Sequence, residues 1–345
     1  MHRPIARALA LAVGVAAIAA ALILLSPNGN LGSILSAFWR GSFGTWSALV
    51  SGTLVRAIPL AIVGAGLSIA FRAGVFNIGG EGQLLLGAVA AATAGLEFTS
   101  LGHAGTVVAL LASALAGAAW AGIAAVLRRR FGVLEVISTI LLNFVAANLV
   151  SYLVRGPLQE PSGALPQTDL IDGSARLLRL GSTRLHYGVF IAIAVCGAAW
   201  WFLNRTAAGF RVRAVGASPS AAAVTGRIDV PAVAAGALMV SGALAGLAGG
   251  IEITGVTYAL YENLSPGYGF SAIAVAILAR NNPLGVLATA LLFAALETGA
   301  LGMQRDAGVP SVVATAIEAV VILAALSVGR GAQWSARRGP AVVAS

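Results

Sequence analysis

The sequence predicts an all-α membrane protein that crosses the bilayer many times. Hydrophobic residues make up 59% of the 345 residues and charged residues only 10%, whereas a soluble domain typically carries about 25% charged residues. Apolar runs of about 20 residues, the length that spans a bilayer as a helix, recur along the chain. The 43 glycines agree with this fold class, because small residues let helices approach closely within a membrane.

About ten apolar segments are expected to cross the membrane, within one permease-like domain that occupies residues 1–345. The first segment is expected to persist as an uncleaved helix, because it is longer than the apolar region of a signal peptide. The third contains a polar interruption, and the eighth is short enough to form a half-helix or a strongly tilted helix. The segments are 5–25, 47–71, 75–97, 104–127, 133–153, 187–203, 231–251, 268–280, 284–302 and 310–328.

The positions of the arginines predict that both termini lie inside the cell. Loops on the cytoplasmic side carry an excess of basic residues, and this orientation places most of the arginines there, including Arg72, Arg205 and Arg330. The net charge of +9 is therefore assigned to these loops and not to binding of nucleic acid. Residues 154–186 become an external loop, which is equally compatible with a docking surface and with a simple solvated loop.

Composition also argues against chemistry carried out by this chain. All 21 basic residues are arginine, so there is no P-loop lysine to contact a nucleotide, and any ATP must be bound by a partner subunit. Cys196 is the only cysteine and the three histidines are far apart in sequence, so no metal site is predicted. Hydrolase motifs are missing as well. We expect a transport subunit with no catalytic residue, metal or cofactor of its own.

The run from Phe76 to Gln83 is unusually polar for its apolar surroundings. It combines Asn77, Glu81 and Gln83 with three glycines. Unwound backbone at membrane depth is tolerated where it is buried in protein or lines a cavity, and such breaks often mark the substrate path of transporters. We therefore predict a helix broken near 76–83, whose polar side chains line the path, brace the freed backbone groups, or do both.

A second polar group lies on the fifth predicted helix. Glu135, Ser138, Thr139 and Asn143 recur at spacings of three to four residues, so they share one helical face. This stripe either lines the substrate path or forms hydrogen bonds between helices, which are typically worth about 1 kcal/mol or less each. The residues alone leave both interpretations open.

The longest predicted cytoplasmic loop, residues 204–230, has the pattern of a docking surface. Basic and apolar residues alternate first, a turn is predicted from Gly216 to Pro219, and Ser218 can cap a short alanine-rich helix that ends in glycine. The alternative is a basic loop without a partner. The residues expected to dock are Arg211, Arg213, Gly216, Ser218, Pro219, Ala221, Ala222 and Gly226.

These three motifs resemble the branched-chain amino acid and simple-sugar permease family of ABC importers, and within it the nucleoside-type subgroup. The resemblance rests on the run FRAGVFNIGGEGQ at 71–83, on residues 135–143, and on residues 213–226. Leu134 and Leu142 depart from the subgroup, which usually has Asn and Met there. Ser218 replaces the usual Asn, and Arg227 replaces the usual Ile.

The resemblance implies a multi-pass permease in the bacterial plasma (inner) membrane. Its expected partners are ABC ATPase subunits, a second permease that is identical or paralogous, an external solute-binding lipoprotein and membrane lipid, but no nucleic acid. Residues 204–230 would insert a coupling helix into the ATPase, and ATP would drive alternating access. The expected cargo is a nucleoside. The alternatives are a simple sugar or another solute, or a proton-coupled secondary transporter that uses carboxylates such as Glu252, Glu297 and Glu318.

Overall fold

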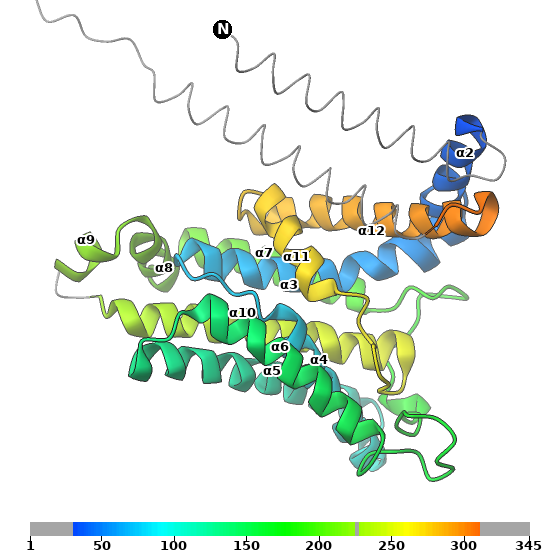
Figure 1. Cartoon of the computed structure of the whole chain (residues 1–345), viewed down its shortest axis with the longest axis horizontal. Coiled ribbons are helices and arrows are strands. Elements are labelled where there is room, and N and C mark those ends of the chain that lie inside the picture. The colour runs from blue at the N-terminus through cyan, green and yellow to red at the C-terminus, as the bar shows by residue number, and fades with distance from the viewer. Residues whose placement is uncertain (1–29, 225–227, 311–345) are drawn as a thin grey trace, which may run out of the picture. The chain divides into compact units, whose positions relative to one another are not determined.

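The computed structural model describes residues 30–224 and 228–310, and within them the regular structure is helical apart from two isolated bridges (Figure 1). Predicted segment 5–25, nearly all of 310–328, and Gly226 lie outside the described residues. The chain divides into two compact units, residues 1–53 with 292–345 and residues 54–291. The described parts of both units are helical, and the polar motifs of the sequence belong to the second.

Six helical stretches in the described part are long and apolar enough to cross a membrane. Two of them join helices of different type: η1 (Ala48–Thr53) continues into α3 (Leu54–Arg72), and α10 (Val230–Glu252) continues into η4 (Ile253–Thr257). The other four are α5 (His103–Phe131), α6 (Glu135–Val154), α7 (Gly188–Arg205) and α12 (Pro283–Ala307).

Two of the predicted segments form helices that are too short or too polar to count among these six. Helix α4 (Gly80–Glu97) is less apolar, because Glu81 and Gln83 occupy its first turn. Helix α11 (Tyr268–Leu278) has 11 residues, in agreement with the short eighth segment predicted from the sequence. The all-helical fold class is thus confirmed, with six of the predicted crossings supported by length and composition.

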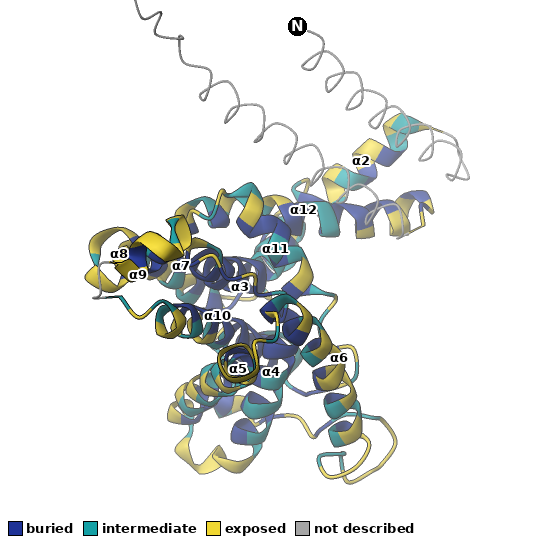
Figure 2. Cartoon of the chain, turned by 60° about the vertical axis from the view of Figure 1, so that its left-hand side comes forward, coloured by how far each residue is buried: buried dark blue, intermediate teal, exposed yellow. Residues whose placement is uncertain are grey.

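The core of the second unit is built around α10, which packs against α3, α4 and α5. Helix α3 is buried along most of its length, whereas α5 and α6 present exposed outer faces (Figure 2). Glycines let the helices of this core meet backbone to backbone: a Cβ atom on Gly246 of α10 would overlap the Ser113 carbonyl of α5. Close helix contact at small residues is typical of membrane proteins.

The polar run does not interrupt a helix, so the predicted break within 76–83 is misplaced. Helix α3 ends at Arg72, residues 73–79 form a non-helical connection, and α4 begins at Gly80. Gly74 has a φ of 73°, a left-handed conformation that glycine adopts without steric cost. Glu81 and Gln83 therefore belong to the first turn of a helix, and Asn77 belongs to the connection before it.

The docking segment also differs from its prediction. Helix α8 (Ala207–Ala217) runs through Gly216, so no turn begins there, and Ser218 alone separates it from α9 (Pro219–Val224). The Ser218 hydroxyl accepts a hydrogen bond from the Ala221 amide at 3.3 Å, as predicted for a capping residue. Figure 1 shows α8 and α9 together at one end of the second unit.

The loop between α6 and α7 is held by the segment that follows α10. The loop contains the short helix η3 (Gly173–Ala175). Its backbone amides donate hydrogen bonds to the carbonyls of Thr254, Tyr258 and Leu260. The guanidinium of Arg176 lies 4.3 Å from the centre of the Tyr258 ring, a favourable cation–π arrangement. Residues 253–262 are therefore anchored from one side, which matters because they contribute to the site described below.

The first unit is small in its described part. Helix α2 (Leu31–Ser42) begins at Asn30, whose side chain accepts a hydrogen bond from the Gly32 amide. Its residues Ile34 and Ala37 share a core with Ala300 and Met303 from the later part of α12. The Thr53 and Thr298 hydroxyls add a buried hydrogen bond of 2.8 Å. In the second unit, the short helix η2 (Thr99–Leu101) joins α4 to α5.

Candidate functional site

Asn77 is the centre of a buried hydrogen-bond network in the connection before α4. Its Nδ2 donates to Gln83 Oε1 at 2.8 Å and to Ser241 Oγ at 3.0 Å. Its Oδ1 accepts from the Gly79 amide at 2.9 Å and from Gln83 Nε2 at 3.0 Å. Asn77 thereby satisfies the polar groups of a non-helical segment that is buried among apolar helices, as buried backbone requires.

The polar stripe of α6 contacts the same connection. Asn143 Oδ1 accepts from the Gly82 amide at 2.8 Å, and Asn143 Nδ2 donates to the Ile78 carbonyl at 2.9 Å. The Ile78 amide donates to Thr139 Oγ1 at 3.3 Å. The fold thus brings together Asn77, Gln83, Thr139 and Asn143 from two sequence motifs, and for these residues the contacts favour the bracing role.

Replacing Asn77 with alanine is expected to lower the melting temperature and the yield of folded protein. The change leaves the Gly79 amide, Gln83 and Ser241 without their partner, and each unsatisfied buried group costs about 1–3 kcal/mol. The matched control is Asn204→Ala, because Asn204 is exposed and its amide donates to the Trp200 carbonyl of its own helix, a bond that links no other element. Size-exclusion chromatography with thermal unfolding compares the two. Equal melting temperatures would contradict the bracing role.

Two members of the stripe have other partners. Ser138 donates to the Glu135 carbonyl of its own helix at 3.2 Å. The Glu135 carboxylate pairs with Arg128 Nη1 of α5 at 2.9 Å. The ion pair of Glu135 links the start of α6 to the end of α5, whereas the Ser138 bond stays within α6. Neither side chain lines the pocket described next.

A pocket of about 370 Å³ opens beside this network, between α4, α6 and the segment that leads into α11. Of the residues predicted for the substrate path, Glu81 and Asn143 line it. Its wall combines carboxylate, amide and hydroxyl groups with two phenylalanine rings. The lining residues are Glu81, Leu85, Asn143, Phe144, Ala147, Asn148, Val150, Ser151, Glu262, Asn263, Ser265 and Phe270.

Glu81 is a buried carboxylate that lines this pocket. The side chain is 8% exposed, and Oε2 accepts a hydrogen bond from the Gly269 amide at 2.7 Å. That amide lies in the first turn of α11, where backbone N–H groups have no helical partner and favour an anion. A Cβ atom on Gly269 would overlap the Glu81 backbone, so only glycine allows this approach. The carboxylate is therefore held in place while still lining the pocket.

Aromatic and amide side chains form the outer wall. Phe144 and Phe270 are 64% and 49% exposed, although each lines the pocket. Asn148 donates to the Phe144 carbonyl at 2.8 Å, which orients its amide on the same helix face. The pocket can thus offer a flat apolar surface together with hydrogen-bond donors and acceptors, a combination that suits a polar ring-containing solute.

Glu262 ties the segment before α11 to α6. Its carboxylate accepts from Arg155 Nε at 2.6 Å and Nη2 at 2.7 Å, and also from the Ser151 hydroxyl. Hydrogen bonds from Arg155 and then Ser151 lower the pKa of Glu262 to about 2. The pair is therefore formed at neutral pH, and its stabilising effect is lost only as the pH falls from about 4.5 toward 2.

Some residues of the pocket that were not predicted from the sequence continue a regular spacing along α6. Thr139, Asn143, Ala147, Ser151 and Arg155 are spaced four residues apart, so they form a row that turns slowly around α6 toward its end. Extending the row beyond Asn143 would have found Ser151, which lines the pocket, and Arg155, which binds Glu262 of the pocket wall. No comparable pattern marks Glu262, Ser265 or Phe270, which reach the pocket through the folding of an irregular segment.

Apart from Gly226, which lies outside the described residues, the predicted docking residues lie on α8, on α9 and at Ser218 between them. Gly216 meets the end of α3, because a Cβ atom there would overlap the Arg72 carbonyl. Arg213 lines a pocket of about 170 Å³ with Arg72 and Asn281, whereas Arg211 is exposed. Phe210 and Val224 are 59% and 87% exposed, and Ala222 is buried. The two helices therefore combine an anchored side with an outer surface that carries apolar side chains.

The fold defines a multi-pass helical membrane protein, and a partly open pocket with polar and aromatic lining lies among its helices. Residues 49–326 match the family model for the branched-chain amino acid transport system permease component. The chain belongs to this family, and it is a permease subunit of an ABC transporter.

Curated relatives match over most of their length. The guanosine ABC transporter permease protein NupP of Bacillus subtilis is 35% identical over 91% of this chain and 90% of its own. The glucose ABC transporter permease protein TsgB13 of Haloferax volcanii is 37% identical over 78% of this chain and 74% of its own. The nucleoside permease protein NupB of Lactococcus lactis is 30% identical over 78% and 77%. No solved structure matches the chain.

Proposed function

We propose that this ABC transporter permease imports a nucleoside, and that the pocket beside Glu81 contacts it. The observation that carries the proposal is the wall of the pocket, in which two exposed phenylalanine rings stand beside the carboxylate of Glu81 and the amide of Asn148. Relatives named for guanosine and nucleoside transport support this cargo.

The chemistry of a nucleoside matches that wall. Its base is a flat ring that can stack on Phe144 or Phe270, and stacking of a base on an aromatic side chain is worth about 1–3 kcal/mol. The N–H groups of the base and the ribose hydroxyls can donate to a carboxylate such as Glu81. The main alternative is a simple sugar, which a relative named for glucose transport favours. A sugar supplies hydroxyls but no aromatic ring.

The importer is proposed to be an assembly in which this chain supplies no catalytic group. Two ABC ATPase subunits would bind ATP, a second permease would complete the path, and an external lipoprotein would deliver the solute. The exposed apolar residues of α8 and α9 support ATPase docking there, where Arg211, Ser218, Pro219 and Ala221 would transmit its movement. We place the assembly in the bacterial plasma (inner) membrane, with about ten crossings and both termini inside.

Uptake measurements test the cargo and the energy source together. Cells with and without the gene receive labelled purine and pyrimidine nucleosides or labelled glucose, either after ATP depletion or with a protonophore. We expect gene-dependent nucleoside uptake that follows ATP and persists without the proton gradient. Gene-dependent uptake of glucose alone would contradict a nucleoside cargo. Uptake that is lost with the proton gradient while the ATP level is maintained would contradict the ATP-driven mechanism.

A variant at the pocket tests the site itself. Replacing Phe144 with alanine removes a stacking surface, so we expect the KM for nucleoside uptake to rise about tenfold, which corresponds to about 1.4 kcal/mol, in the lower half of the range for a lost stacking contact. The matched control is Phe190→Ala, because Phe190 is similarly exposed on α7 but does not line the pocket. Equal effects of the two substitutions at equal expression would exclude this pocket from the substrate path.

A further inference from the structure

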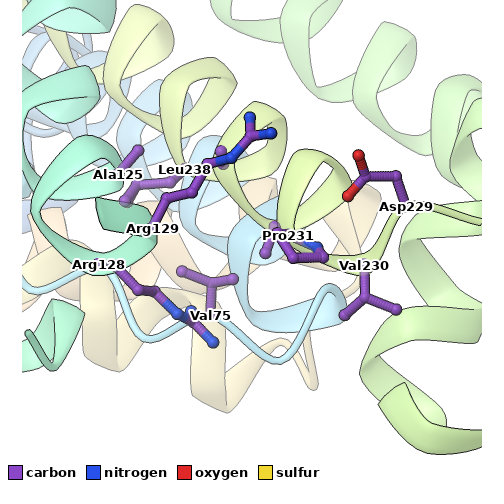
Figure 3. Close-up of a pocket in the computed structure, with 10 residues that line it drawn as sticks. Val75, Ala125, Arg128, Arg129, Asp229, Val230, Pro231 and Leu238 are labelled. Atoms are coloured by element: carbon purple, nitrogen blue, oxygen red, sulfur yellow. The ribbon is translucent and has the colours of Figure 1, made fainter. Parts of the chain in front are cut away.

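A second cavity of about 440 Å³ lies between the end of α5 and the start of α10 (Figure 3). Arg128, Arg129 and Asp229 contribute its charged groups, and apolar side chains form the rest of its wall. In Figure 3 the side chain of Arg129 extends across the cavity from α5, and Asp229 lies on the opposite side beside Val230 and Pro231. The apolar wall consists of Val75, Ala125, Val230, Pro231, Ala234, Ala235 and Leu238.

The position of this cavity along α5 corresponds to the phospholipid headgroups. Helix α5 has 29 residues, which makes it about 44 Å long at about 1.5 Å per residue. That length equals a bilayer with its headgroup layers, about 40–45 Å. The arginines Arg128–Arg130 belong to its last turn, and a helix of this length that stands upright in a bilayer brings such a turn to the level of the phosphates on the side that this end faces.

The cavity carries both positive and negative charges, so it does not favour a simple anion. Arg128 already pairs with Glu135 at 2.9 Å. Arg129 has no hydrogen-bond or ion-pair partner among residues 30–224 and 228–310. Asp229 caps α10 through one oxygen, which accepts from the Ala232 amide at 3.0 Å, and its charge opposes that of Arg129. A bound group with one negative and one positive charge therefore suits this cavity better than an anion alone.

We propose that this cavity binds the headgroup of a zwitterionic membrane phospholipid, specifically a phosphoethanolamine group. The phosphate contacts Arg129, with Arg128 beside it, because guanidinium groups bind phosphate through paired N–H donors. The ammonium faces the carboxylate of Asp229. The glycerol and the first carbons of the acyl chains lie on the apolar wall at Ala125, Ala235 and Leu238. Basic pockets between membrane helices are known to bind the phosphates of anionic lipid headgroups, and here the carboxylate of Asp229 adds a partner for an ammonium group.

Native mass spectrometry of the full-length permease in neutral detergent tests this proposal. The protein is titrated with phosphatidylethanolamine or phosphatidylglycerol that carry identical acyl chains. We expect tighter retention of phosphatidylethanolamine, and a loss of about fivefold in its affinity for Arg129→Gln, the effect of one arginine at a membrane surface. The matched control is Arg130→Gln, because Arg130 lies in the same helical turn but does not line the cavity. That control should bind like the unchanged protein.

Two further variants separate the parts of the site. Asp229→Asn keeps the helix cap, since asparagine caps as well as aspartate, and should abolish the preference for phosphatidylethanolamine over phosphatidylglycerol. Ala235→Phe fills the cavity without changing its charge and should remove binding of both lipids. Elution as a single folded species, checked for every variant, separates loss of binding from misfolding.

Three results would overturn the proposal. The first is equal lipid retention by the Arg129→Gln and Arg130→Gln variants. The second is a preference for phosphatidylglycerol that Asp229→Asn leaves unchanged. The third is displacement of the lipid by millimolar inorganic phosphate, which would identify a site for a free anion and not for a lipid.

Discussion

Replacing Gly246 with leucine is expected to prevent folding of the permease. Gly246 of α10 lies where α4 and α5 also meet, because Cβ atoms on Gly87 and Gly117 would overlap its backbone. A Cβ atom on Gly246 itself would overlap the Ser113 carbonyl. The clash is with backbone, so a change of side-chain rotamer cannot relieve it. Overpacking a dense core costs about 1–3 kcal/mol and occasionally more, and a clash with backbone belongs at the upper end.

The measurement is the fraction of expressed protein that elutes as a folded species after solubilisation. Gly197→Leu is the matched control, because Gly197 also lies within a long helix, α7, and has nothing within 4 Å of its Cβ direction. We expect near-normal recovery for this control and little or none for Gly246→Leu. Similar recovery for both variants would contradict the packing of α4, α5 and α10 at this glycine.

Replacing Gly216 with alanine is expected to impair transport much more than folding. Gly216 lies in α8 and packs against the Arg72 carbonyl, so a single methyl group forces α8 away from the end of α3. Under the proposed function, α8 and α9 receive the movement of an ATPase, and the contact between Gly216 and Arg72 passes that movement to α3. We expect the uptake rate to fall about tenfold, which corresponds to roughly 1.4 kcal/mol of lost coupling.

The control for this prediction is Gly236→Ala. Gly236 lies in α10 with open space around its Cβ direction, so alanine should leave transport unchanged and slightly favour the helix. Uptake and ATP hydrolysis are measured on the assembled transporter. ATP hydrolysis that persists while uptake falls is the expected signature of uncoupling. Unchanged uptake in Gly216→Ala would show that the α8–α3 contact does not transmit the movement.

Much of this protein could be predicted from residue order. Long apolar runs predict membrane helices because a bilayer offers the backbone no other hydrogen-bond partner, and their approximate bounds agree with α3, α5, α6, α7, α10 and α12. The cap at Ser218 and the shortness of α11 were also predicted, since both depend on local spacing. The motifs predicted the family, which the match over residues 49–326 confirms.

Other properties depended on contacts between distant segments. Asn77, Glu81 and Asn143 all belong to polar patterns in the sequence, yet their roles in the fold differ. Asn77 braces a buried connection, Asn143 both braces it and lines the pocket, and the Gly269 amide holds the Glu81 carboxylate in the pocket wall. Local sequence specifies which polar groups exist and which share a helical face. The partner of each group is decided by packing, because a buried hydrogen bond forms with whatever donor or acceptor the tertiary fold brings within about 3 Å.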